Sequence, residues 1–249
     1  MTSAYIEERI RRASPPSANV IDGSTPVIAF GNAQLARVAT LGLNPSGVEF
    51  VGADGVLLTG TDRRLATHPS LGTAALSSAP YKIIEQVAQE CNEYFERNPY
   101  RRWFNQLLPI VQICGACYYD GSACHLDLVQ WATSPVWGRL RRDVREQLVA
   151  EDVDFLGKQL QNENIDILLI NGRGALTHFS QQFINKITID EVHIINSRQP
   201  VKIYAGSGFG KITIVGWSTN IQSSFGVTTE LRIELAEQIG RLASSRTPI

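Results

Sequence analysis

Short apolar runs that alternate with amphipathic segments constrain the fold of this chain more than any other feature. Buried strands are expected at residues 36–41, 123–129, 166–170, 192–196, 201–204 and 211–215. Helical periodicity marks residues 81–97, 100–113, 139–160, 175–183 and 228–243. Strands that are buried on both faces and joined through helices form mostly parallel sheets. The sequence therefore predicts an α/β fold, a three-layer α/β/α sandwich around a mostly parallel central sheet.

The composition predicts a single domain that spans residues 1–249. With 249 residues and 43% hydrophobic content, the chain can bury one large core. Residues 1–17 are expected to form a helical arm, because a Ser-Pro-Pro-Ser breaker follows a charged segment with a helical pattern. This segment lacks the apolar core of a secretory signal, and no apolar run reaches membrane-spanning length. We therefore expect a cytoplasmic protein with no membrane partner.

Four cysteines raise the question of a metal site. Cys91, Cys114, Cys117 and Cys124 supply the number of thiolates that zinc or an iron–sulfur cluster needs. The alternative is that they are ordinary reduced thiols, with Gly115 capping a helix that ends near residue 113. We favour the second interpretation and predict neither a metal nor another cofactor.

A sharp polar turn follows the first predicted strand. In the segment Gly42-Leu43-Asn44-Pro45-Ser46-Gly47, Pro45 stiffens the backbone and Gly47 keeps it uncrowded. Ligands bind at the carboxyl ends of strands in open α/β sheets. Asp127 lies on the second predicted strand, and a polar stretch, residues 216–226, follows the last one. Three such segments converging at one sheet edge would form a pocket, whereas each alone could be an ordinary strand-to-loop turn.

Over residues 38–243 the chain resembles the uracil-DNA glycosylase superfamily in the order and spacing of three short motifs. Gly42-Leu43-Asn44-Pro45 fits the first motif of that family, Gly-x-(Asp/Asn/Glu)-Pro. Leu126-Asp127-Leu128-Val129 stands where family members carry a base-reading Asn. Trp217-Ser218-Thr219-Asn220-Ile221 stands where the family has His-Pro-Ser-Pro-Leu. The resemblance is to divergent members that restrict phages by excising modified bases, and it implies a uracil-DNA glycosylase-like fold.

The resemblance also implies roles for individual residues. Asn44 would position the water that attacks C1′, and Trp217 would replace the His that donates a hydrogen bond to the departing base. Gly42 would belong to the base-binding pocket. Because no Lys stands in the first motif, we expect a monofunctional glycosylase. DNA contacts would come from the loop residues Ser218, Thr219, Asn220, Ile221, Gln222 and Ser223. Ile221 would be the wedge that fills the gap left by a flipped base or, alternatively, a loop residue in the core.

Two positions bear on the identity of the base. An ionised Asp127 only accepts hydrogen bonds and so favours an exocyclic amine such as cytosine N4, unless it instead caps a neighbouring backbone. Ser46 stands where uracil-specific members carry a Tyr that excludes 5-substituents, so a bulky substituent could fit there. Phe50 would stack on the base or, alternatively, belong to the core. Trp131 and Trp137 could line a sugar-sized cavity or pack under a loop.

These residues predict a DNA glycosylase that hydrolyses the N-glycosidic bond of a bulky 5-substituted cytosine. An example is glucosylated hydroxymethylcytosine in phage DNA, where the abasic sites left behind would serve as an antiviral defence. The partner would be double- or single-stranded DNA with a flipped base, and no protein partner is inferred. Because the net charge is −1, the DNA-binding surface would be a local patch. The alternatives are a glycosylase for uracil or another deaminated base, and a non-catalytic nucleic-acid-binding protein of the same fold.

Overall fold

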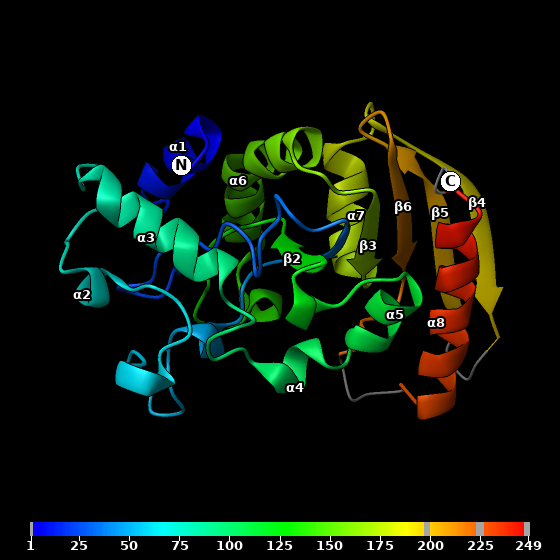
Figure 1. The fold of residues 1–249 in the computed structure, drawn as a ribbon, viewed down its shortest axis with the longest axis horizontal. Coiled ribbons are helices and arrows are strands. Elements are labelled where there is room, and N and C mark those ends of the chain that lie inside the picture. Colours follow the sequence, from blue (N-terminus) through cyan, green and yellow to red (C-terminus); the bar gives the residue numbers. More distant parts are fainter. Residues whose placement is uncertain (1, 197–199, 223–226, 247–249) are drawn as a thin grey trace. The chain divides into compact units, whose positions relative to one another are not determined.

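The computed structural model describes residues 2–196, 200–222 and 227–246 (Figure 1). The chain divides into two compact units. The first unit consists of Met1–Asn32, Leu43–Pro99 and Leu126–Gln159. The second consists of Ala33–Gly42, Tyr100–His125 and Leu160–Ile249. The sequence predicted one domain. Each unit is assembled from three separate segments, so no shift in composition along the chain marks the division.

A six-stranded sheet, in the order β2-β1-β3-β6-β5-β4, is the centre of the second unit. Its strands are β1 (Val38–Gly42), β2 (Ala123–Asp127), β3 (Ile167–Asn171), β4 (Ile187–Ile195), β5 (Val201–Gly208) and β6 (Ile212–Trp217). The last two residues of β2 already belong to the first unit. β3 pairs in parallel with both β1 and β6, while β5 is antiparallel to β6 and to β4. The predicted α/β class is confirmed. The strands β5 and β4 form an antiparallel edge next to the parallel strands of the sheet.

β1, β2, β3 and β6 form where the apolar runs predicted them, because these strands bury both of their faces. β4 alternates half-buried and exposed residues over most of its length, and it begins at Ile187, ahead of the strand predicted at residues 192–196. All five residues of β3 and all six of β6 are buried. A tight turn at Phe209 and Gly210, both with positive φ, joins β5 to β6. Gly206 lies inside β5, where an added Cβ would stand 1.9 Å from the Thr188 carbonyl oxygen of β4. A side chain at that position would push the edge strand away.

Helices of the second unit pack on this sheet and on one another. α7 (Arg173–Gln182) contacts β3 and β6, and α8 (Thr229–Ser244) contacts β6 and α5 (Leu108–Ile113). A single helix was predicted over residues 100–113, and this is wrong. The structure has a short α4 (Arg101–Phe104) followed by α5, with Pro109 in the first turn of α5. Pro has no N–H to donate and clashes with the preceding turn, so it starts a new helix there.

The first unit is built from helices and long loops. Its helices are α1 (Ala4–Arg11), α2 (His68–Leu71), α3 (Tyr81–Asn92) and α6 (Arg142–Asn162), the last of which extends three residues beyond the unit. The predicted helical arm at the N-terminus is α1, which packs on α3. Between β1 and α3 the chain forms α2 and two 3₁₀ turns, Gly47–Glu49 and Gly60–Asp62.

A buried ion pair holds α1 in place within the first unit. Arg9 is completely buried, and its guanidinium donates to Asp152 of α6 and, through Nε, to Gln130 Oε1, each at 3.0 Å. The backbone N–H of Gln130 donates to Asp152 Oδ2 at 2.8 Å. The guanidinium also lies 5.0 Å from the centre of the Trp131 ring. The helical arm is therefore anchored in the same segment, residues 130–131, that approaches the first predicted motif.

Two further features bear on the predicted class of protein. Among the described residues, no helix is both long enough and apolar enough to cross a membrane.

The described residues also contain no group of three or more His, Cys, Asp or Glu side chains placed to hold a metal ion. Burial raises the pKa of the Cys91 thiol to about 12 and that of Cys114 to about 11. These two thiols therefore stay protonated at neutral pH.

Candidate functional site

The turn that follows β1 is fixed by a neighbouring segment of the first unit. Val129 N–H donates to the Leu43 carbonyl at 2.9 Å, which sets the backbone after β1 beside residues 127–133. Ser46 then precedes the 3₁₀ turn Gly47–Glu49, whose close approach to Ile21 leaves little room at Gly47. The motif is therefore a packed element and not a free loop.

The Asn44 side chain is oriented by its amide nitrogen. Nδ2 donates to the Trp131 carbonyl at 3.1 Å and to Thr133 Oγ1 at 3.2 Å. Asn44 is half-buried, and among the described residues nothing donates a hydrogen bond to its Oδ1. An amide that uses both N–H groups for anchoring presents its oxygen in one direction as a pure acceptor. This geometry is suited to holding a water molecule by one of its protons.

The segment that holds Asn44 is itself held by the N-terminal part of the first unit. Ile21 N–H donates to the Ala132 carbonyl at 3.0 Å, and Ser134 N–H donates to the Asn19 carbonyl at 2.9 Å. These bonds form an isolated antiparallel bridge around Thr133. Together with the Arg9 ion pair, they fix the two acceptors that orient Asn44.

A buried carboxyl that sequence reasoning missed lies five residues beyond Asn44. Glu49 is 2% exposed, and its Oε2 accepts a hydrogen bond from the Tyr94 hydroxyl at 2.7 Å. Arg64 Nε stands 4.0 Å from the same oxygen. Burial raises the pKa of Glu49 to about 7, against the opposing effects of Tyr94 and Arg64, and the nearby Asp127 raises it further. No local pattern marks a Glu on a 3₁₀ turn as buried, so only its tertiary contacts reveal it.

Asp127 is buried in the same unit. After burial, which is the main cause, its proximity also acts to raise the pKa of Glu49. Its backbone carbonyl accepts from Gln130 Nε2 at 2.9 Å, which closes the turn after β2. Of the predicted catalytic and base-binding residues, the structure thus has Asn44, Ser46, Phe50 and Asp127 in the first unit, and Glu49 is added to them.

Two other predicted base-binding residues have plainer surroundings. Phe50 is 1% exposed, which matches the alternative that it belongs to the core. Gly42 is the last residue of β1 and is half-buried. Ser46 is half-buried as well.

Trp217 does not have the role that the sequence predicted for it. It is completely buried in the second unit, and its Nε1 donates to Asn171 Oδ1 at 3.0 Å. An indole has a single N–H, so this group is not available to a departing base. The prediction of Trp217 as the replacement donor is therefore corrected. Its N–H joins β6 to the end of β3.

Asn171, which sequence reasoning also missed, organises the loop that follows β6. Its Oδ1 also accepts from Ile221 N–H at 3.2 Å, and its Nδ2 donates to Asn220 Oδ1 and Gln222 Oε1 at 3.0 and 2.8 Å. The next residue, Gly172, has φ +90°, and an added Cβ would lie 3.2 Å from that of Asn220. Three hydrogen bonds of this amide hold the loop, and in the fourth its oxygen accepts from the Trp217 N–H of β6.

The predicted DNA-contacting residues lie on this loop with different exposures. Ile221 is 1% exposed, so the core alternative is correct in this state and a wedge would require the loop to move. Asn220 is exposed, while Ser218, Thr219 and Gln222 are half-buried. Ser218 Oγ accepts from Lys202 N–H at 3.0 Å. Ser223 lies outside the described residues.

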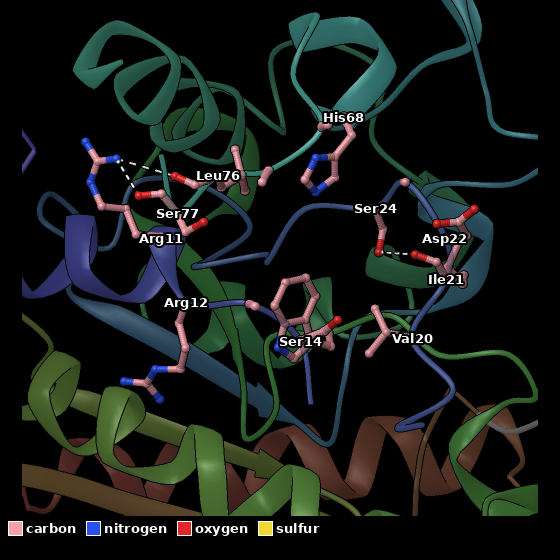
Figure 2. Close-up of a pocket in the computed structure, with 15 residues that line it drawn as sticks. Arg11, Arg12, Ser14, Val20, Ile21, Asp22, Ser24, His68, Leu76 and Ser77 are labelled. Carbon is pink, nitrogen blue, oxygen red and sulfur yellow. Dashed lines mark hydrogen bonds between the residues drawn. The ribbon is translucent and has the colours of Figure 1, made fainter. Parts of the chain in front are cut away.

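A cavity of about 370 Å³ lies in the first unit and is lined in part by Trp131, the residue whose carbonyl holds Asn44. Figure 2 shows His68 pointing into the hollow, while the Arg11 guanidinium turns to the carbonyls of Leu76 and Ser77. The lining includes Trp131 but not Trp137, Asn44 or Asp127, so the sugar-sized cavity expected between the two tryptophans stays a prediction. The observed cavity is therefore a separate space from the cluster around Asn44.

Neither a scan against protein-family models nor a search of curated proteins finds a match for this chain.

Proposed function

We propose that this chain is a monofunctional DNA glycosylase that hydrolyses the N-glycosidic bond of a 5-substituted cytosine. The observation that carries the proposal is the Asn44 amide, held through Nδ2 by Trp131 and Thr133 with Oδ1 left as an acceptor. The motif resemblance and the α/β fold with a parallel core support the same class. A three-layer, uracil-DNA glycosylase-like architecture, a DNA partner and an antiviral role all belong to this proposal.

In the proposed reaction, Asn44 Oδ1 accepts a hydrogen bond from a water molecule below C1′ of a flipped nucleotide. The water oxygen bonds to C1′ while the bond from C1′ to the base breaks and its electron pair leaves with the base. The water proton is lost to solvent, and the base takes up a proton, so the products are an abasic site and a free base. The oriented amide contributes by positioning the nucleophile, not by accepting its proton.

The preference for a substituted cytosine rests on two side chains of the first unit. Asp127 accepts hydrogen bonds and would match the N4 amine of the base. Ser46 is small and leaves space where a larger side chain would meet a 5-substituent. A mismatch at a buried polar pair costs about 1–3 kcal/mol, enough to decide which base is excised.

The deciding experiment is a base-release assay on matched duplexes that carry cytosine, uracil, 5-hydroxymethylcytosine or its glucosylated form, with released bases identified by mass spectrometry. We expect release of a 5-substituted cytosine by the wild type and none by Asn44→Ala. Asn164→Ala is the matched control, because it also removes one amide hydrogen bond to a backbone carbonyl, that of Gln34. Equal turnover by wild type and Asn44→Ala would remove Asn44 from the mechanism.

A second candidate function is a nucleic-acid-binding protein without catalysis. The observation that favours it is the occupied N–H of Trp217, since the last motif then supplies no donor to a departing base. This candidate predicts tight binding to DNA with no base released from any of the four duplexes. The same assay therefore separates the two functions.

A further inference from the structure

The Glu49 carboxyl has one anchored oxygen and one open oxygen. Oε2 accepts from the Tyr94 hydroxyl and faces Arg64 Nε, whereas no hydrogen bond reaches Oε1 from any residue that the structure describes. The side chain is nevertheless 98% buried, being 2% exposed. Oε1 is not among the described side-chain atoms that are fully enclosed without a hydrogen-bond partner, so it keeps a small accessible surface at which another molecule can reach it. Oε1 is therefore a hydrogen-bonding position that the folded chain leaves for another molecule.

The surroundings of Glu49 also keep a proton within reach at neutral pH. Burial raises the pKa of the carboxyl to about 7, and the neighbouring Asp127 carboxylate acts in the same direction. The charged and titratable groups that face it are Tyr94, Arg64 and Asp127. Tyr94 and Arg64 both act on Oε2. When the carboxyl is protonated, the proton consequently sits on Oε1, which then becomes a donor.

To bind the edge of an aminopyrimidine, a protein needs one hydrogen-bond acceptor next to one hydrogen-bond donor. Cytosine presents the N4 amine as a donor and N3 as an acceptor, whereas uracil presents the O4 acceptor and the N3–H donor. Asp127 alone could match N4 but would leave N3 without a donor. A protonated Glu49 supplies the missing donor, and the same group opposes the N3–H of uracil.

We propose that Glu49 is a base-binding residue that, in its protonated form, donates through Oε1 to N3 of the cytosine whose N4 amine is bound by Asp127. This inference rests on the proposed function and adds a second specificity-determining carboxyl to it. Glu49 and Asp127 both hydrogen-bond to one edge of the base. The protonation state of Glu49 then determines whether cytosine or uracil is bound. Binding of the cytosine-type base is accordingly tied to the protonation of one side chain.

The test is an equilibrium binding measurement that needs no turnover. The probe is a fluorescent duplex with one 5-hydroxymethylcytosine on a 2′-fluoroarabino sugar, which resists hydrolysis, and a second duplex carries uracil on the same sugar. Full-length protein is titrated by anisotropy at about pH 6 and about pH 8. Only the protonated fraction binds the cytosine probe, so its Kd should rise roughly tenfold between these values. The Kd for the uracil probe should not rise.

Two variants report on Glu49 itself. Glu49→Gln keeps an N–H donor but cannot ionise, so its affinity for the cytosine probe should stay constant with pH. Tyr94→Phe removes a hydrogen bond that favours the charged form. The fall in affinity should therefore move to higher pH, a shift that a merely structural role would not produce. Glu90→Gln is the matched control, because Glu90 is another buried carboxyl but is paired with Arg63.

The outcomes separate this inference from the proposed function. If the wild type releases a 5-substituted cytosine but Glu49→Gln keeps the wild-type pH dependence, the role of Glu49 is refuted and the glycosylase stands. If Glu49→Gln fails to fold, the Tyr94→Phe variant provides the test: an unshifted pH profile of its affinity for the cytosine probe refutes the role of Glu49. If the wild type binds neither probe and releases no base, the proposed function itself has failed.

Discussion

The buried ion pair between Arg9 and Asp152 allows a stability prediction whose size follows from the structure. Arg9→Met removes both guanidinium hydrogen bonds, at 3.0 Å to Asp152 and to Gln130, while keeping most of the apolar volume. Asp152, which is 1% exposed, then keeps only the Gln130 N–H as a partner. Leaving one charge of a buried pair uncompensated costs about 3–5 kcal/mol. That is a large part of the roughly 5–15 kcal/mol that stabilises a typical domain.

The double variant Arg9→Met/Asp152→Asn separates the cost of the orphaned charge from the cost of lost packing. Because it removes both charges, we expect it to recover much of the stability that Arg9→Met loses. Arg142→Met is the surface control, since Arg142 pairs with Glu146 on the exposed side of α6. Exposed pairs of this kind contribute little, so this variant should unfold like the wild type.

The assay is urea unfolding followed by circular dichroism, with midpoints and m-values compared across the four proteins. Hydrogen exchange at residues 130–134 gives a local readout, because the ion pair holds Gln130 next to the segment that orients Asn44. An Arg9→Met variant within about 1 kcal/mol of the wild type would refute the reasoning. So would a double variant no more stable than the single one.

Four further outcomes are expected. Ser46→Tyr should block release of a 5-substituted cytosine and spare an unsubstituted one in the base-release assay, and equal loss on both would show that Ser46 does not face C5. Asp127→Asn should lower kcat/KM on the cytosine-type substrate by about ten- to a hundredfold, or roughly 1–3 kcal/mol, with the melting temperature unchanged. Asn171→Ala should lower the free energy of unfolding by about 1–3 kcal/mol in urea, because it strands the Trp217 N–H. Because the pKa of Glu49 is raised to about 7 in the folded state, its stabilising contribution is present below about pH 4.5 and is lost as the pH rises through 7. The free energy of unfolding of the wild type should therefore fall across that window by up to about 3 kcal/mol relative to Glu49→Gln, whereas parallel pH profiles would contradict the assignment.

Several elements were readable from the sequence because their signals are local. The apolar runs at residues 38–41 and 167–170 became β1 and β3, and the Asn-Pro turn appeared directly after β1. Burial on both faces leaves an uninterrupted apolar run, and a turn leaves Pro and Gly, so neither needs a partner to be recognised. The break at Pro109 was also a local signal, although the helical pattern around it concealed it.

Other features depend on contacts between residues far apart in the sequence, and only the tertiary structure decided them. Glu49 accepts a hydrogen bond from Tyr94 and has its pKa raised in part by Asp127, and Trp217 donates its N–H to Asn171. Strand direction in the β4–β5–β6 edge also follows from pairing, since alternation along one strand does not encode its neighbour's direction. The sequence by itself determined which segments become strands, helices and the Asn44 turn, because periodicity records local burial. The hydrogen-bond partners of buried polar groups come from segments far apart in the sequence, so only the tertiary structure determines them. In this chain, those contacts explain why the Trp217 N–H cannot donate to a departing base and why Glu49 Oε1 lacks a hydrogen bond from the described residues.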